Sequence, residues 1–199
     1  MRQVSGRHHV PCVWETHYVT PLAHFRNLRH RTLPCGPLQP SDTYYVLEAL
    51  PREGGQSITF VAERRYAEKL LCRSGRLPLP VFNPLYRSYV KHGTERDPRA
   101  CMSGLNADLY DAIHMLCIVR GDMPRNGITR TLESLRSNPE APVKKHEIVR
   151  FAHALAQGGD ESPLSIAIER LRKAIPGLRD FPFKFLRVRM LHENLAVGL

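Results

Sequence analysis

The change of periodicity near residue 63 is the feature that most limits the folds open to this chain. Residues 44–50 and 57–62 are rich in β-branched and aromatic side chains, and Pro-Arg-Glu-Gly-Gly at 51–55 supplies a turn between them. Residues 63–74 then place apolar side chains at helical spacing, and Gly75 follows as a helix terminator. Alternation predicts strands, whereas spacings of three and four residues predict a helix. We therefore expect a β-hairpin followed directly by a helix.

Helical spacing dominates the second half of the chain. It runs through 109–117, 144–156 and 164–175, although the apolar run Met115 to Val119 could equally finish as a strand. Phe181 to Leu191 alternates apolar and basic side chains, which predicts a final strand. Helices and strands are mixed with no regular β-α-β period, and this favours an α+β domain with a small mixed sheet and flanking helices.

The first 43 residues have weak periodicity and are rich in His, Pro and Arg. They predict a loop-rich N-terminal entry with one strand around Cys12 to Tyr18. A chain of 199 residues suits one domain with a real core. The predicted organisation is therefore a loop-rich segment at 1–43 and a single α+β domain at 44–199 with C-terminal helices and strand.

The charge balance points to a polyanionic partner. The chain has 29 Lys and Arg against 19 Asp and Glu, a formal net charge of +10. Residues 61–100 are the most basic part, with 9 Lys and Arg against 4 acidic residues. Phosphate contacts and counterion release give such a surface sequence-independent affinity for nucleic acid or nucleotide. A protein that is merely basic is the alternative.

Cysteine usage and hydropathy suggest a reducing, cytoplasmic location. The five cysteines form no Cys-x-x-Cys pair, which argues against a disulfide framework and against a zinc ribbon. No apolar run approaches the ~20 residues of a membrane span, and no apolar segment follows the basic N-terminus as in a signal peptide. We expect no membrane insertion.

Residues 124–143 carry the strongest functional signal. An apolar run leads to a turn at Asn126-Gly127, a short amphipathic helix containing Arg130 follows, and Ala141 to Val143 is a candidate strand. Glycine lets backbone N–H groups approach an anion, a helix N-terminus offers unpaired donors, and arginine can bind two oxygens. A strand, a glycine loop and a helix start thus predict a phosphate site. A plain Asn-Gly turn is the alternative.

This segment resembles the glycine-x-x-arginine loop and helix of the ParB/sulfiredoxin superfamily, and more narrowly the plasmid fertility inhibition factor family. In that family Asn-Gly-x-x-Arg-Thr opens a helix and a Pro-Val strand follows, as Asn126 to Thr131 and Pro142-Val143 do here. A second similarity joins Arg65 to Lys69 with the proline-rich Leu77 to Val81. The two similarities cover about a fifth of the chain.

The resemblance implies a compact ParB/sulfiredoxin-type domain, encoded on a mobile element, that blocks conjugative transfer of plasmid DNA. It implies ATP hydrolysis and DNA cleavage, with ATP and a divalent metal as cofactors, and the coupling ATPase or relaxosome as partner. Gly127 would hold the phosphate loop and Arg130 would contact phosphate as the catalytic residue, with Asn126, Thr129 and Thr131 as further contacts. Thr129 stands where partition proteins more often have histidine or arginine, which argues against their mode of nucleotide hydrolysis. Helix capping is an alternative role for the two threonines.

Two non-enzymatic functions stay open beside this interpretation. One is a decoy that docks on the conjugation machinery without turnover, and the other is a basic DNA-binding regulator. For either, the predicted helix at 63–74 could lie along a DNA backbone, although charge runs are usually a solvated face. Its basic residues are Arg64, Arg65, Lys69 and Arg73.

Scattered carboxylates and histidines offer weaker hypotheses. Asp108 and Asp111, or Glu133, could hold the metal of a nuclease, but a chain with 19 acidic residues contains such pairs by chance. The N-terminal histidines fit no single ligand helix, so no metal site is predicted from them. They are His8, His9, His17, His24 and His30.

Overall fold

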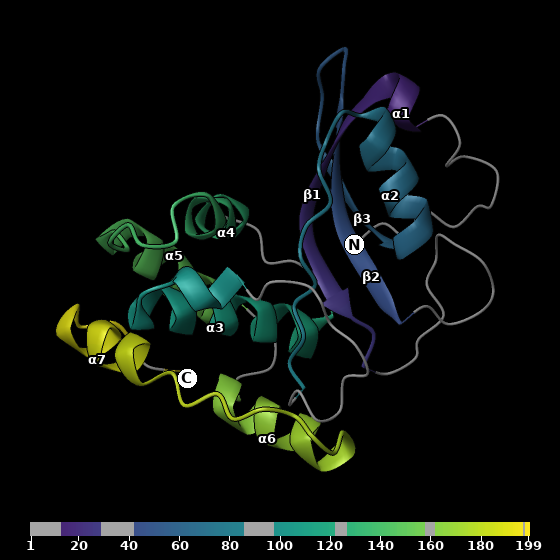
Figure 1. Ribbon diagram of the computed structural model, residues 1–199. Helices are drawn as coiled ribbons and strands as arrows, with labels where there is room; N and C mark the ends of the chain where they lie inside the picture. The colour runs from purple at the N-terminus through teal and green to yellow at the C-terminus, as the bar shows by residue number, and fades with distance from the viewer. Residues whose placement is uncertain (1–12, 29–41, 86–97, 122–126, 158–161, 197) are drawn as a thin grey trace. The chain divides into compact units, whose positions relative to one another are not determined.

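The chain combines one small sheet with several helices, as the α+β prediction states. The computed structural model describes residues 13–28, 42–85, 98–121, 127–157, 162–196 and 198–199 (Figure 1). Contacts between Cα atoms divide the chain into two compact units, residues 1–83 and 84–199. In the described residues, the first unit contains the sheet and the second is built from helices.

A three-stranded antiparallel sheet, ordered β1-β2-β3, forms the first unit. Its elements are α1 Val13–Thr16, β1 His17–Arg26, β2 Thr43–Pro51 and β3 Ile58–Glu63. Strands β2 and β3 pair with Val46 opposite Val61, which confirms the predicted hairpin. Gly54 in the turn has φ 88°, a conformation that glycine adopts without steric cost.

Helix α2 Arg64–Arg73 follows β3 directly and packs on one face of this sheet (Figure 1). It begins at Glu63, whose carboxylate accepts hydrogen bonds from the N–H groups of Arg65 (2.9 Å) and Tyr66 (3.2 Å). Gly75, with φ 64°, follows its end, so the predicted helix and its terminator are confirmed. The buried core between helix and sheet contains Val19, Tyr45, Leu47, Ala62, Ala67, Leu70 and Leu71.

Strand β1 corrects the prediction of a loop-rich N-terminal segment. Ten residues of that segment form an edge strand paired with β2, so residues on both sides of position 43 belong to one sheet. Pro21 and His24 interrupt the alternation of apolar and polar side chains by which a strand is recognised in a sequence. Pro21 sits at an irregularity in the edge strand, where a missing N–H is tolerated. His24 is buried because its ring bonds to the Leu79 carbonyl and the Thr43 hydroxyl. Of the strand expected at Cys12 to Tyr18, residues 13–16 form α1 instead, whereas His17 and Tyr18 begin β1; Cys12 lies outside the described residues.

Helix α3 occupies the centre of the second unit and packs against each of the helices that follow it (Figure 1). Ser103 caps its N-terminus, and Gly121 with φ 74° ends it. The elements of this unit are the 3-10 helix η3 Pro98–Cys101, α3 Gly104–Arg120, α4 Ile128–Ser137, α5 Lys145–Ala156, α6 Leu164–Ala174 and α7 Lys184–His192. The helices predicted at 109–117, 144–156 and 164–175 are confirmed.

The interpretation of Met115 to Val119 as a strand is wrong, because these residues continue α3. The helix is covered on several sides, so Met115 and Leu116 are both buried although they are neighbours in sequence. A helix buried on several sides loses the polar positions that mark its period, and its sequence then reads as a continuous apolar run.

The two remaining predicted strands are also wrong. Ala141 to Val143 is irregular, and the carbonyls of Pro139 and Ala141 accept hydrogen bonds from the Asn106 side chain instead of from a neighbouring strand. Residues 181–183 are irregular, and the rest of Phe181 to Leu191 belongs to helix α7. The first N–H groups of this helix donate to the carboxylate of Asp108. A capping group 77 residues away in sequence leaves no local signal.

None of the helices in the described part of the chain is both long and apolar enough to cross a bilayer.

Candidate phosphate-binding site

Helix α4 begins at Gly127, the residue on which the predicted phosphate loop depends. Gly127 has φ 79° and is the N-cap, and its carbonyl accepts the first helical bond from the N–H of Thr131 at 3.1 Å. The amides of the first turn donate to no capping side chain at this residue. These N–H groups lie at the positive end of the helix dipole. Asn126 lies outside the described residues.

Arg150 of α5 lies against this helix start. A Cβ atom at position 127 would sit 3.2 Å from both Cδ and Nε of Arg150 and 3.5 Å from Cζ. Glycine at 127 therefore serves two purposes: it permits the positive φ, and it leaves room for the arginine. The packing of α5 on α4 brings the guanidinium to the helix end.

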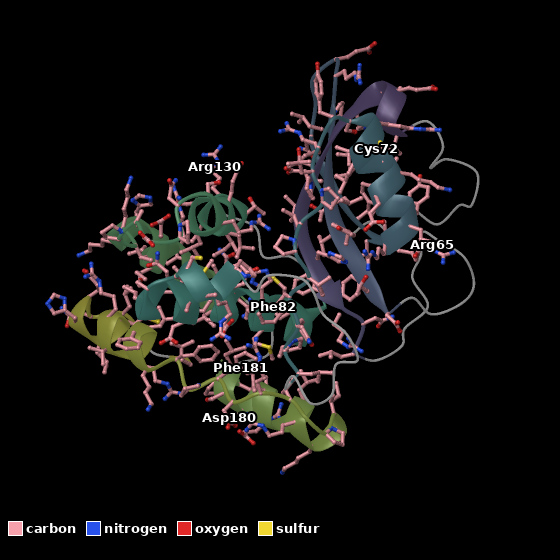
Figure 2. The ribbon with its side chains drawn as sticks, viewed as in Figure 1. Arg65, Cys72, Phe82, Arg130, Asp180 and Phe181 are labelled. Carbon is pink, nitrogen blue, oxygen red and sulfur yellow. The ribbon has the colours of Figure 1, made fainter. Side chains whose placement is uncertain are left out.

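Arg130 is the second cation at this end of α4. It is exposed, and it points outward from the helix (Figure 2). Because Gly127 and Arg130 are three residues apart, they lie on the same face of the helix. Among the described residues, no side chain forms an ion pair with Arg130 or Arg150. The start of α4 thus has backbone N–H groups, Arg150 against Gly127 and Arg130 one turn along the helix, and a phosphate group accepts from donors of these kinds.

The two threonines of the motif occupy different environments. Thr131 is fully buried, and its hydroxyl lies 3.4 Å from the Gly127 carbonyl, to which it donates. That geometry fits a role in holding the helix start better than contact with a ligand. Thr129 is partly exposed on the first turn.

A buried histidine of α3 lies near a partly exposed arginine of α4. His114 of α3 is 1% exposed, and its Nδ1 donates to the Tyr110 carbonyl at 2.7 Å. Burial, with a smaller contribution from the nearby Arg136 of α4, lowers its pKa from 6.5 to about 3, although the hydrogen bond to the Tyr110 carbonyl opposes this shift. Burial also lowers the pKa of Arg136. His114 is therefore neutral at physiological pH.

Asp108 and Asp111, considered above as metal ligands, have structural partners. Asp108 caps α7, whereas Asp111 is buried and pairs with Arg99 at 3.0 Å and with Arg179 at 3.9 Å. Within the described ranges, no group of three or more His, Cys, Asp or Glu side chains has the arrangement of a metal site. His24 is likewise held by hydrogen bonds in the first unit.

The predicted DNA-contacting residues lie on α2, in the first unit. Arg65, Lys69 and Arg73 are exposed and follow one another at intervals of four residues, so they form a row along the helix. Figure 2 shows Arg65 extending outward from α2. Arg64 differs, because its Nε pairs with the Glu68 carboxylate at 2.8 Å.

Arg150 is the residue of the site that sequence reasoning missed. It belongs to α5, 20 positions from Arg130, and in the sequence it reads as an ordinary basic residue of an amphipathic helix. Only the packing of α5 against α4 reveals its position at the helix start.

No protein-family model matches this chain, and neither a curated protein nor a solved structure shows significant similarity to it.

Proposed function

We propose that this protein binds phosphate groups of nucleotide or DNA at the N-terminus of α4 and thereby inhibits conjugative DNA transfer. The observation that carries the proposal is the position of Arg150 against Gly127, with Arg130 on the same end of the helix. Backbone donors and two guanidinium groups can surround the oxygens of one phosphate. Inhibition of transfer rests on the resemblance to fertility inhibition factors.

A ParB/sulfiredoxin-type fold and a cytoplasmic location belong to the same proposal. The glycine start of α4 supports such a fold. The element that precedes α4 in the described chain is helix α3 and not the expected strand, so the proposed site lies at the start of the second of two successive helices. Because of that difference, the proposal rests on the side chains at the start of α4 more than on the fold type.

Binding is better supported than turnover. Amides and guanidinium groups orient a phosphate and stabilise its charge, but neither acts as a general base at neutral pH. Hydrolysis of ATP or cleavage of DNA would need a further group and the divalent metal that the resemblance implies. We therefore propose that the protein acts as a decoy that occupies the transfer machinery or its nucleotide. An ATPase or DNase activity is the enzymatic alternative that the resemblance implies.

A conjugation assay tests this function. Donor cells expressing the wild-type protein should transfer plasmid DNA less often than cells without it. The double variant Gly127→Ala/Arg130→Ala and the single variant Arg150→Ala should each restore transfer, whereas Lys173→Ala, which removes one exposed cation from α6, should not. Circular dichroism checks that all variants fold. Equal inhibition by all four proteins would show that the α4 site does not contribute to inhibition. No inhibition by wild type would refute the fertility-inhibition proposal.

The basic row on α2 favours a second candidate function, a DNA-binding regulator. Three exposed cations at helical intervals of about 6 Å can follow a phosphate backbone. A regulator of this type would bind duplex DNA with a steep salt dependence and would be indifferent to Arg130→Ala and Arg150→Ala. Filter binding of a duplex at several salt concentrations distinguishes it from the α4 site.

A further inference from the structure

Helix α7 has two opposite apolar faces. Leu186 and Met190 point into the second unit and are fully buried. On the other side Phe185, Val188 and Leu191 are 60%, 68% and 64% exposed. Their spacing of three residues aligns them as a ridge along the outside of the helix. Single exposed apolar residues are ordinary, but a row of three on a helix that already buries its other face is not.

Basic side chains lie beside this ridge. Lys184 and His192 are exposed beside the three apolar residues, and Arg187 lies at the margin. Glu193, which follows the helix, is engaged by two cations of its own unit: Lys145 and Arg189 each lie 2.8 Å from its carboxylate. The outward face of α7 is therefore apolar along its middle and positive at its edges.

The helix is also held firmly in place. The carboxylate of Asp108 accepts hydrogen bonds from the N–H groups of Phe185 (2.8 Å) and Leu186 (3.2 Å). The Phe185 ring lies directly on Gly104, where a Cβ atom would be 2.5 Å from the ring. One edge of the aromatic ring thus packs on the backbone of α3, while the residue as a whole stays 60% exposed. A preorganised ridge loses little conformational entropy when a partner binds.

We propose that the outward face of α7 docks an acidic amphipathic helix of a partner protein. The apolar ridge matches the apolar stripe of such a helix, and the basic margins match carboxylates on its flanks. A second copy of this chain fits poorly, because the basic margins of two copies would face each other. An anionic lipid surface is the competing occupant for an apolar ridge with basic margins, and the vesicles in the test below distinguish it from the peptide. The proposal does not depend on the phosphate site of α4.

The test uses the full-length protein and a fluorescein-labelled helical peptide of about 20 residues, long enough to form a stable helix. The peptide carries Leu at heptad positions a and d and Glu at e and g, and a matched peptide has Lys in place of every Glu. Fluorescence anisotropy measures binding to wild type, to Val188→Asp and to Ile166→Asp. Ile166 is a control on α6, 46% exposed, that lies outside the ridge.

The acidic peptide should bind wild type and Ile166→Asp alike, Val188→Asp should bind it at least about tenfold more weakly, and the basic peptide should not bind. Equal binding by Val188→Asp, or no binding of the acidic peptide at about 1 mM, would overturn the proposal. Vesicles of phosphatidylcholine and phosphatidylglycerol provide a second probe: sedimentation with them that Val188→Asp abolishes would assign the face to lipid instead. A dimer in light scattering that Val188→Asp dissociates would assign it to a second copy. Either result overturns the proposal.

Discussion

The basic row of α2 and the start of α4 are both positive, yet their geometry differs. Arg65, Lys69 and Arg73 lie one after another along a helix, each exposed to solvent. At α4, by contrast, backbone donors, Arg130 and Arg150 occur at one helix end, and Gly127 provides the room. A row of charges suits a linear polyanion, whereas charges gathered at one point suit a single phosphate group. The net charge alone does not distinguish these two kinds of site.

The two helices also pack against different surroundings. Helix α2 packs on an apolar core between helix and sheet. Helix α4 packs on α3, where the buried neutral His114 lies near Arg136 of α4. The stability of the α4 region therefore depends on the protonation of a buried side chain.

The largest expected effect is a loss of stability in acid. Because the folded pKa of His114 is about 3 and its ordinary value is 6.5, the unfolded chain takes up a proton first as the pH falls. The stabilisation is present above pH 6.5 and is lost towards pH 3. Between pH 6.5 and 4.5 this one residue should lower the free energy of unfolding by about 2 kcal/mol. Urea denaturation followed by circular dichroism measures it.

His114→Gln should remove this part of the pH dependence, whereas His153→Gln, at an exposed position of α5, should keep it. If the two variants have the same pH profile as wild type, His114 does not couple proton uptake to unfolding of the α4 region.

The next effect separates the two basic regions by nucleotide affinity. Arg150→Ala should raise the dissociation constant of a fluorescent ATP analogue by about tenfold, because a guanidinium at the helix end is removed. Arg150→Lys should recover only part of the affinity, since lysine cannot bind two oxygens in a fork. Lys69→Ala on α2 should change this constant less than about twofold. A larger effect of Lys69 than of Arg150 would reverse the comparison.

A smaller effect is expected from Gly127→Ala. The new Cβ atom would need a left-handed backbone and would press on Arg150, so stability should fall by about 1 kcal/mol and nucleotide affinity should fall as well. Gly75→Ala is the matched control: Gly75 has φ 64° but open space around it. It should lose similar stability while nucleotide affinity is unchanged. Loss of affinity in both variants would show that stability, and not the site, determines binding.

The smallest effect concerns the salt dependence of DNA binding. Removing one phosphate-binding cation from the row on α2 should reduce the slope of log K against log salt by about 0.9. Lys69→Ala should show this reduction, and Arg64→Ala should show less because Arg64 already pairs with Glu68. Filter binding to a duplex measures both. Equal slopes in wild type and Lys69→Ala would exclude this row from the DNA interface.

Local signals predicted the elements whose stability is local. The hairpin of β2 and β3 and helix α2 follow from alternation, a glycine turn and a change of period, all within residues 43–75. Helix α7 shows the opposite case. Its sequence alternates like a strand, yet the carboxylate of Asp108 and the burial of Leu186 and Met190 determine a helix. Tertiary partners distant in sequence overrode the local pattern there.

The same limit applies to the site. Gly127 and Arg130 lie three residues apart, so their proximity could be predicted from the sequence. The contribution of Arg150 depends on how α5 packs against α4, and the burial of Thr131 depends on which face of α4 meets the core. Neither property is encoded in residue spacing.

The most direct test of the α4 site is a titration of the isotopically labelled protein with ADP, followed by amide chemical shifts in NMR spectra. If phosphate binds at the start of α4, the largest shifts will occur at the amides of Gly127, Ile128 and Thr129, and they will disappear in Arg150→Ala. Largest shifts along α2, or shifts at α4 that Arg150→Ala leaves unchanged, would contradict it.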